Sequence, residues 1–316
     1  MIFEHLQELE SAVERGDLEA IEKMRGGRGQ RVRHAPPFIR SALMLSGHRL
    51  RHLNRLDELE ADIVILNLED GVAPALKPMA LRLVALFLAE ARKIRSKSVV
   101  RINPLEEGGR EEIAYLNTVG PDAIRVPKIR SAEDVREALG LVDRRIALHL
   151  SIETKEAFEA LPTLRVESRV EAFYLGALDL LASMGLPQRI VQLHNPTMHY
   201  ILARFLMKTS AQGALPISFV YQEYADTEGF ENWCLLERRM GYHAKGCISP
   251  TQVEIANRIF TPSSEEIEWA RRVVELFESD PRSSGFADGE LGFVDEPVYK
   301  SAKGLLERFG DEIGGN

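Results

Sequence analysis

The chain has 316 residues, of which 45% are hydrophobic and 28% are charged, and its formal net charge at pH 7 is −8. These proportions exclude a mainly disordered chain, a collagen-like repeat and a small disulfide-stapled scaffold. The acidic balance argues against a general nucleic-acid binder, and no nucleic-acid partner is expected.

The first part of the chain, residues 1–37, differs from the rest. Residues 3–24 have helical spacing and alternating charge, whereas residues 25–33 combine arginine with glycine and precede Pro36 and Pro37. This composition predicts a helix followed by an exposed linker. The alternative is a short segment that binds RNA or phosphate groups.

Two further features bear on the cellular compartment. The N-terminus has no basic leader with an apolar core, and no apolar run approaches the ~20 residues that a membrane span needs. The two cysteines, Cys234 and Cys247, show neither metal-ligand nor redox spacing. We therefore expect a cytoplasmic protein with reduced thiols and without a membrane partner.

Between residues 38 and 279, short apolar runs alternate with longer helical patterns. The strand-like runs are residues 41–45, 63–68, 98–103, 123–127, 146–152, 172–175, 217–221 and 246–249. Helical patterns include residues 78–93, 132–141, 195–210 and 228–240, and Ser131 with Asp134 and Ser263 with Glu266 fit capping boxes. Eight strands alternating with helices predict an α/β fold, a (β/α)8 TIM barrel. The alternative, a doubly wound sheet, would want a glycine-rich turn that residues 45–50 lack.

The C-terminal part begins with an amphipathic pattern over residues 264–278. A segment rich in turn residues follows at 280–292, and a last helical pattern covers residues 297–309. A glycine-rich segment between two helices suggests a movable lid. We therefore predict a C-terminal lid and helix over residues 280–316, with a flexible tail as the alternative.

Polar residues gather where the predicted strands end, which is where barrel enzymes carry their chemistry. They are Glu69, Asp70, Arg101, Asn103, Lys128, Glu153, Asp179, Tyr221 and Ser249. Each one alone could be a structural ion pair or a helix cap. Charged groups are nevertheless rare on buried strands, so the whole set indicates one site at the mouth of the barrel.

Two of these residues, Glu153 and Asp179, lie on adjacent predicted strands and suit a hard cation. Mg²⁺ is usually held by one or two carboxylates together with water and substrate oxygens. Arg101 is always charged and can grip a carboxylate or a developing oxyanion. His194 and His199 lack the spacing of a zinc pair and are interpreted as residues of a helix surface.

Several motifs in order resemble the citrate lyase β-subunit-like family of the HpcH/HpaI aldolase superfamily. The matching segments are residues 40–47, 65–74 with Lys77, 100–104, 126–129, 152–154, 175–180, 241–252 and 260–262. The resemblance implies a TIM barrel and a Mg²⁺-dependent carbon–carbon lyase. The usual substrate in that family is a coenzyme A thioester of a short hydroxy diacid, which gives a 2-oxo acid.

The same resemblance implies a role for individual residues. Glu153 and Asp179 resemble the metal ligands, Arg101 resembles the arginine that contacts the oxo acid, and Glu69 and Asp70 match an acidic pair beside the substrate. Arg40, Gly176 and Ala177 fall in motifs that line the substrate site. Residues 285–297 resemble a lid whose aspartate, here Asp295, enters the active site of a neighbouring subunit. A homo-oligomer, a trimer or hexamer that exchanges lids, is therefore expected.

The chain departs from the family pattern at two positions. Asn67 stands where the family usually has aspartate, and Ser249 stands where it usually has histidine. The preferred substrate is citramalyl-CoA, cleaved to acetyl-CoA and pyruvate, with malyl-CoA as a close alternative. A citrate lyase β-subunit, a non-catalytic acyl-CoA-binding subunit and an RNA-associated protein are further alternatives. Arg25, Arg28, Arg31 and Arg33 are candidates for contacts with coenzyme A phosphates.

Overall fold

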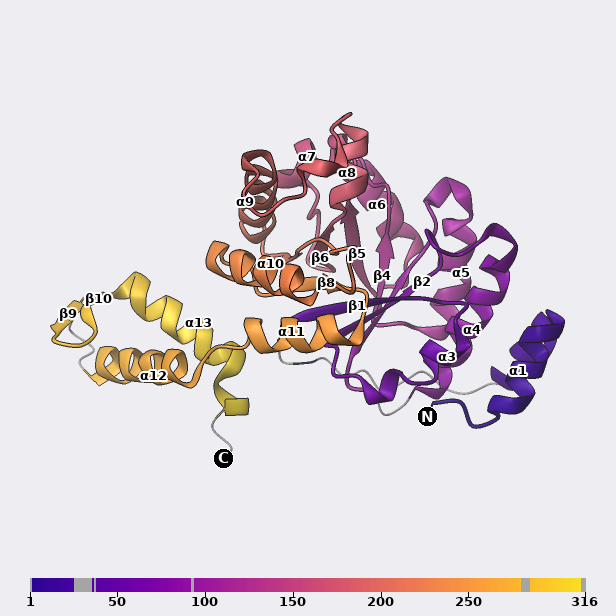
Figure 1. Ribbon diagram of the computed structural model, residues 1–316, viewed down its shortest axis with the longest axis horizontal. Helices are drawn as coiled ribbons and strands as arrows, with labels where there is room; N and C mark the ends of the chain where they lie inside the picture. Colours follow the sequence, from indigo (N-terminus) through magenta and orange to yellow (C-terminus); the bar gives the residue numbers. More distant parts are fainter. Residues whose placement is uncertain (1, 26–35, 37, 92–93, 280–284, 314–316) are drawn as a thin grey trace. The chain divides into compact units, whose positions relative to one another are not determined.

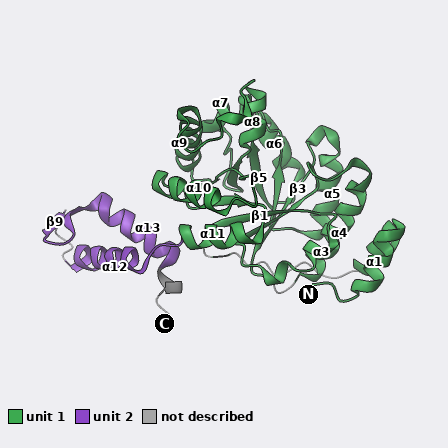
Figure 2. Cartoon of the chain, in the orientation of Figure 1, with its two compact units in different colours: residues 1–260 green, residues 261–316 purple. Residues whose placement is uncertain are grey.

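The structure is a computed structural model, and it describes residues 2–25, 36, 38–91, 94–279 and 285–313. By contacts within the chain it divides into two compact units, Met1–Phe260 and Thr261–Asn316 (Figure 2). The first unit contains the barrel, and the second contains the last two helices.

The first unit is built on a single parallel sheet. Within the described residues its eight strands are β1 (Ser41–Ser46), β2 (Ile63–Asn67), β3 (Lys97–Arg101), β4 (Ala123–Val126), β5 (Ala147–Ile152), β6 (Val170–Leu175), β7 (Leu215–Ile217) and β8 (Lys245–Cys247). They pair in the order β7-β6-β5-β4-β3-β2-β1-β8 (Figure 1). An isolated bridge between Ser218 and Lys245 spans the remaining gap between β7 and β8. The sheet is therefore a nearly closed barrel, as predicted.

Strand β7 starts earlier than the sequence pattern indicated. Residues 217–221 were predicted, but the ladder with β6 covers Leu215–Ile217. The predicted bounds were wrong because Phe219, an apolar residue that follows the strand, is also buried. Its ring contacts the ring of Trp233. Burial in a loop imitates the apolar run of a buried strand.

Helices surround the sheet and follow its strands along the chain (Figure 1). Those of the first unit are α1 (Leu6–Arg15), α2 (Leu18–Arg25), α3 (Leu50–Leu53), α4 (Lys77–Glu90), α5 (Gly109–Val119), α6 (Ala132–Leu141), α7 (Lys155–Ala160), α8 (Ala177–Ser183), α9 (Pro196–Ser210), α10 (Thr227–Met240) and α11 (Pro250–Phe260). Helix α6 begins with the predicted capping box, in which Ser131 and Asp134 each accept a hydrogen bond from the other's backbone N–H.

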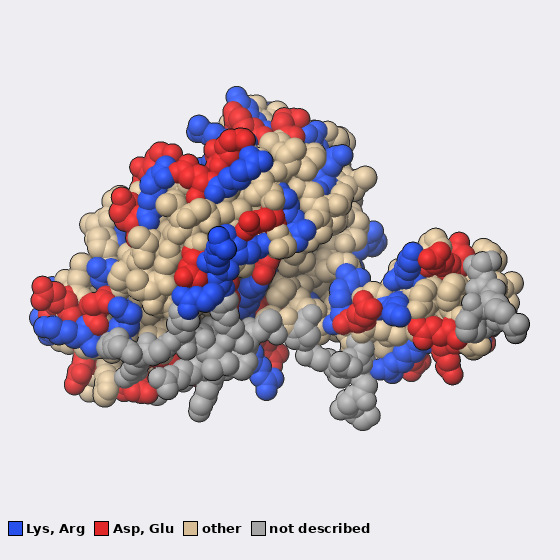
Figure 3. All heavy atoms as spheres, turned by 180° about the vertical axis from the view of Figure 1, so that it is seen from behind, with Lys and Arg blue, Asp and Glu red and all other residues tan. Residues whose placement is uncertain are grey.

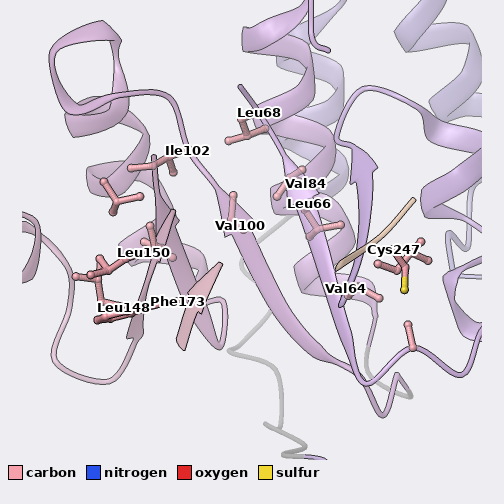
Figure 4. Packing of buried hydrophobic residues seen from close by; sticks show 14 of the residues in the cluster. Val64, Leu66, Leu68, Val84, Val100, Ile102, Leu148, Leu150, Phe173 and Cys247 are labelled. Atoms are coloured by element: carbon pink, nitrogen blue, oxygen red, sulfur yellow. The ribbon is translucent and has the colours of Figure 1, made fainter. Parts of the chain in front are cut away.

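Side chains alternate between the two faces of each strand, because a strand has a period of two residues. On β2, Val64 and Leu66 belong to the large apolar cluster between the sheet and the helices, whereas Ile63 and Ile65 belong to the cluster inside the barrel. Figure 4 shows part of the outer cluster, with residues from several strands and Val84 of α4. The alternation places Asn67 and Glu69 on the inward face, at the carboxyl end of the barrel.

Over its described residues 2–25, the N-terminal segment contains two helices, α1 and α2, where the sequence indicated one helical pattern. Gly16 adopts the left-handed conformation, with φ 68°, and ends α1. Such a residue ends many helices because glycine lacks the Cβ that disfavours this conformation. Helix α2 packs against α4. The arginine–glycine segment, including Arg28, Arg31 and Arg33, lies outside the described residues.

The second unit contains α12 (Ser264–Ser279), β9 (Gly285–Asp288), β10 (Gly292–Asp295) and α13 (Glu296–Ile313). Of the segment predicted to be rich in turns, residues 285–292 belong to an antiparallel hairpin of β9 and β10, and the preceding residues 280–284 lie outside the described residues. Ala270 and Val273 of α12 form an apolar cluster with Val294 and Ala302. Helix α12, which the predicted boundary at residue 280 placed with the barrel, thus shares a core with the C-terminal hairpin and helix.

Surface charge is mixed in sign. Figure 3 shows lysine and arginine side chains interspersed with aspartate and glutamate on the face that it presents. Among the described residues, no helix combines the length and apolar character needed to cross a membrane.

Candidate active site

Three predicted residues meet at the carboxyl ends of β2, β3 and β5. The guanidinium of Arg101 forms an ion pair with Glu69, and its Nη2 lies 3.5 Å from Glu153 Oε2 and 3.6 Å from Asp70 Oδ2. The side chains of Arg101, Glu69 and Glu153 are at most 6% exposed, whereas that of Asp70 is 67% exposed. One buried cation therefore sits among three carboxylates, at the position where barrel enzymes carry their active sites.

The electrostatics of this cluster affect Glu69 most. Burial raises the pKa of Glu69 to about 7, against the opposing effect of the Arg101 guanidinium. The nearby carboxylates of Glu153 and Asp70 add to the increase. A carboxyl group with such a pKa can accept or donate a proton near neutral pH.

Glu153 and Asp179, the predicted metal ligands, are brought together by Lys128. Lys128 Nζ lies 3.0 Å from Asp179 Oδ1 and 3.7 Å from Glu153 Oε1. Its backbone N–H also donates a hydrogen bond of 2.9 Å to Glu153 Oε1. Burial lowers the pKa of Lys128, but the two carboxylates outweigh burial and the pKa is raised overall.

Two features of the backbone, at Lys128 and at Gly176, allow close contact with Glu153. Lys128 has φ 55°, in the left-handed region that residues other than glycine seldom adopt. Gly176, which precedes α8, lies against Glu153: a Cβ added there would lie 2.6 Å from Glu153 Cβ and 3.0 Å from Oε2. Gly176 therefore lies beside Glu153, and Ala177, which follows it, is buried; their predicted role in substrate binding stays a prediction.

An open cavity of about 670 Å³ leads to the cluster. Its lining includes Glu69, Asp70, Lys128 and, from the neighbouring loops, Lys77 and Asn103. Lys77 donates to Asn103, whose Nδ2 in turn donates a 2.5 Å hydrogen bond to the buried Glu112. The cavity thus opens Lys77 and Lys128, together with Glu69 and Asp70, to solvent.

The barrel interior below the cluster is also polar, and sequence analysis did not identify it. Arg125 is buried on β4, where Nε donates a 2.8 Å hydrogen bond to Ser151 and the guanidinium lies 4.1 Å from the centroid of the Tyr174 ring. Burial and the repulsion of Arg101 lower the pKa of Arg125 to about 10. Further in, Tyr174 contacts His149 at 3.0 Å. Strand alternation was the available signal, because these residues share the inward face with Arg101 and Glu153.

Arg40 does not join the site. It precedes β1 and so lies at the amino end of the barrel, where Nη2 forms a 2.9 Å ion pair with Asp62 Oδ1. The carboxyl ends that hold Arg101 and Glu153 are at the other end. We therefore correct the expectation that Arg40 lines the substrate site, because chain direction places it on the opposite face of the barrel.

The remaining predicted residues have local contacts. Asp295 ends β10 in the second unit, and its Oδ1 accepts a 3.3 Å hydrogen bond from Val298 N at the start of α13. Asn67 accepts from the backbone N–H of Glu69, and Ser249 accepts from that of Gln252. Tyr221 donates a 2.6 Å hydrogen bond to Asp226. The two departures from the family pattern are thus accommodated by hydrogen bonds to the backbone.

Residues 40–250 match the family model described as HpcH/HpaI aldolase/citrate lyase. The chain belongs to this family. The family resemblance that the sequence motifs indicated is therefore confirmed, and the match spans the barrel from the residue before β1 to the start of α11.

Relatives within this family differ in the reaction that their names state. A (3S)-malyl-CoA thioesterase of Cereibacter sphaeroides is 33% identical over 249 residues, which cover 78% of this chain and 86% of that protein. An L-malyl-CoA/β-methylmalyl-CoA lyase of Rhodobacter capsulatus is 28% identical over 275 residues, covering 76% and 84% of the two chains. Both names refer to malyl thioesters of coenzyme A.

A solved structure provides the structural comparison. The protein CitE from Mycobacterium tuberculosis, in complex with magnesium, acetoacetate and coenzyme A, is 26% identical and superposes with a TM-score of 0.70. The match covers 86% of this chain and 98% of that one. A citrate lyase from Burkholderia xenovorans, at 20% identity and a TM-score of 0.78, shares the fold.

Proposed function

We propose that this chain is a Mg²⁺-dependent carbon–carbon lyase that cleaves a short 3-hydroxydiacyl-CoA. The observation that carries the proposal is that Glu153 and Asp179 both contact Lys128, with Glu153 also beside the buried Arg101, at the carboxyl end of the barrel. The family and the names of its members, which refer to malyl thioesters, support a coenzyme A thioester as the substrate.

The residues present fit a magnesium ion. The described residues contain no cluster of three or more histidine, cysteine or acidic side chains that could hold a metal by themselves. Two carboxylates nevertheless suffice for Mg²⁺, which keeps several water or substrate oxygens in its shell. Glu153 and Asp179 would hold the ion, and Mg²⁺ bound there would supply Lewis-acid polarisation of substrate oxygens.

The chain's own residues account for the charge and proton movements that cleavage requires. The hydroxyl group of the substrate loses its proton, the carbon–carbon bond breaks to give a 2-oxo acid, and the resulting thioester enolate takes up a proton to give the new thioester. Arg101, fixed by Glu69, would offset the negative charge as it moves. Glu69, whose pKa is raised to about 7, would accept the proton that the hydroxyl group loses, from its place beside Arg101.

The protonation of the enolate is assigned by family resemblance to Asp295 of a neighbouring copy. This assignment requires a homo-oligomer, proposed to be a trimer or hexamer. In it, the hairpin of one chain would contribute Asp295 to the active site in the barrel of another chain. Citramalyl-CoA, cleaved to acetyl-CoA and pyruvate, remains the preferred substrate. Malyl-CoA would give glyoxylate instead of pyruvate, and the two oxo acids differ by one methyl group, worth about 1–3 kcal/mol in a pocket.

A second candidate function is hydrolysis of the thioester bond, with malyl-CoA as substrate. The specific observation in its favour is the 33% identity to a (3S)-malyl-CoA thioesterase. The two reactions differ in their products. A lyase releases acetyl-CoA and an oxo acid, whereas a thioesterase releases free coenzyme A and malate.

The test is to follow both thioesters in parallel after EDTA treatment, with and without added Mg²⁺, and to quantify all products by mass spectrometry. We expect Mg²⁺-dependent formation of acetyl-CoA with pyruvate from citramalyl-CoA. Glu153→Gln, Asp179→Asn and Arg101→Gln should each reduce kcat/KM by about 10²-fold or more. Glu156→Gln, a change at an exposed residue of α7, should leave it unchanged.

Three other outcomes would contradict parts of the proposal. Free coenzyme A without acetyl-CoA would establish the thioesterase instead. A large preference for malyl-CoA would retain the reaction and overturn the substrate. No turnover of either thioester by folded, Mg²⁺-supplied protein would favour a non-catalytic acyl-CoA-binding subunit or a citrate lyase β-subunit that needs its partner chains.

A further inference from the structure

Lys128 occupies an unusual position for a lysine. Its Nζ contacts the carboxylates of both Asp179 and Glu153, at 3.0 and 3.7 Å. These are the two groups proposed above to hold a divalent cation. The ammonium therefore supplies positive charge to the same pair of oxygen ligands that the ion would use.

The backbone shows that this placement is built into the fold. The left-handed conformation of Lys128, with φ 55°, is unfavourable for any residue with a Cβ and persists where surrounding contacts enforce it. Here the conformation lets the backbone N–H donate to Glu153 Oε1 while the side chain of the same residue reaches Asp179. A single residue thus engages both carboxylates through separate groups.

The side chains of Glu153, Lys128 and Asp179 differ in exposure, and this difference would allow a divalent cation to replace the lysine ammonium. Glu153 is 1% exposed, whereas Lys128 is 35% and Asp179 is 47% exposed. Glu153 is fixed between Arg101 and the Lys128 backbone, but the lysine side chain borders the open cavity and has room to move into it. An ammonium on a flexible four-carbon stem can leave without disturbing its own backbone hydrogen bond.

We propose that Lys128 is an internal counter-cation of the site. Its ammonium bridges Glu153 and Asp179 when no divalent cation is bound, and cation binding displaces it into the cavity. The inference rests on the proposed function, because it takes these two carboxylates as the cation ligands. Lys128 acts through the ligands and is therefore a positioning residue, which limits cation affinity while it keeps the carboxylates together.

Mg²⁺ binding to the full-length chain after EDTA treatment tests this proposal by isothermal titration calorimetry, without substrate. Lys128→Met removes the competing charge and keeps the length of the side chain, so it should bind Mg²⁺ at least about tenfold more tightly than the wild type. Lys128→Arg keeps the charge and should bind like the wild type. Lys155→Met, which removes an exposed lysine near Glu153 in sequence, is the matched control and should also bind like the wild type.

A second measurement uses the wild-type chain and does not depend on the folding of a variant. Lysine acetylation by an activated acetate ester, followed by peptide mass spectrometry, compares Lys128 with Lys155 in the absence and presence of saturating Mg²⁺. Displacement from the carboxylates should make Lys128 react faster with Mg²⁺ present, while Lys155 should not change.

Unchanged or weaker Mg²⁺ binding by Lys128→Met would overturn the proposal, since the lysine would then only help to shape the site. Slower or unchanged acetylation of Lys128 in the presence of Mg²⁺ would overturn it as well. Both results differ from a failure of the proposed function, in which neither the wild type nor Lys128→Met would bind Mg²⁺ and Glu153→Gln would change nothing.

Discussion

His149 shows how the barrel interior changes the chemistry of one residue. It is buried on β5, in contact with Tyr174 at 3.0 Å, and burial lowers its pKa to about 4. The imidazole is therefore neutral in the folded chain at neutral pH, although the unfolded chain would protonate it near the ordinary pKa of about 6.5. A low folded-state pKa means that the unfolded state binds the proton first as pH falls.

This difference predicts a pH dependence of stability. The contribution of His149 to the free energy of unfolding should decrease by about 1 kcal/mol as pH falls from about 7 to 5.5, because the unfolded state is protonated first. Glu69, whose pKa is raised to about 7, should contribute a change of opposite sign that is the same in the wild type and in His149→Gln. Urea unfolding at about pH 7 and pH 5.5 measures the contribution of His149 as the difference between these two proteins. His149→Gln should remove that contribution, whereas His52→Gln, a change at an exposed residue of α3, should retain it. An equal change in the free energy of unfolding between the two pH values in the wild type and His149→Gln would refute the assignment.

At the scale of elements, Gly176 at the junction between β6 and α8 allows the backbone to lie against the side chain of Glu153. Gly176 has an ordinary negative φ, so space and not backbone conformation requires glycine there. Any Cβ would meet the Glu153 side chain, which is itself held by Arg101 and the Lys128 N–H. The end of β6 and the start of α8 therefore pack directly against the side chain of Glu153.

Gly176→Ala should therefore displace Glu153. We expect a loss of about 1–3 kcal/mol in the free energy of unfolding, the usual cost of overpacking, together with weaker Mg²⁺ binding in calorimetry. Gly140→Ala is the matched control, because nothing lies within 4 Å of an added Cβ in that α6 position. Wild-type Mg²⁺ affinity in Gly176→Ala would mean that Glu153 is not a cation ligand or that it tolerates the shift.

At the scale of the whole barrel, the strand ladder is interrupted between β7 and β8, which only an isolated bridge connects among the described residues. Instead of a ladder, Ser218 N–H donates to the carbonyl of Ala244 and the Ser218 carbonyl accepts from Gly246 N–H. The side chain of Lys245 is fully buried next to this bridge. Lys245 Nζ lies 2.7 Å from Glu237 Oε1 on α10 and 4.0 Å from the centroid of the Phe219 ring. This buried ion pair connects the last strand to the helix that precedes it.

Lys245→Met should lower the free energy of unfolding by about 3–5 kcal/mol, because it leaves Glu237 buried without its partner. Burial already raises the pKa of Glu237, so part of the loss should be relieved at low pH by protonation. The double variant Lys245→Met with Glu237→Leu should recover stability relative to Lys245→Met in denaturant unfolding. A double variant that is less stable than both single variants would contradict this role.

Much of the barrel could be predicted from the sequence, because strand periodicity and helix caps depend on residues a few positions apart. The runs that became β2 and β5, and the capping box of Ser131 with Asp134, are such local features. The alternation of side chains along each strand, which points Arg101 and Glu153 into the barrel, is a local feature too. It also contained Arg125 and His149, which the analysis of strand ends passed over.

The tertiary structure decided which of these residues meet. Glu69, Arg101 and Glu153 come from separate strands, and their contacts exist because the sheet closes and brings the carboxyl ends together. The direction of β1 in this parallel sheet places Arg40 at the opposite end, where it pairs with Asp62. The role of Lys128 depends on a backbone conformation and two carboxylates distant in sequence, and no local pattern specifies those contacts because they arise from the packing of the whole barrel.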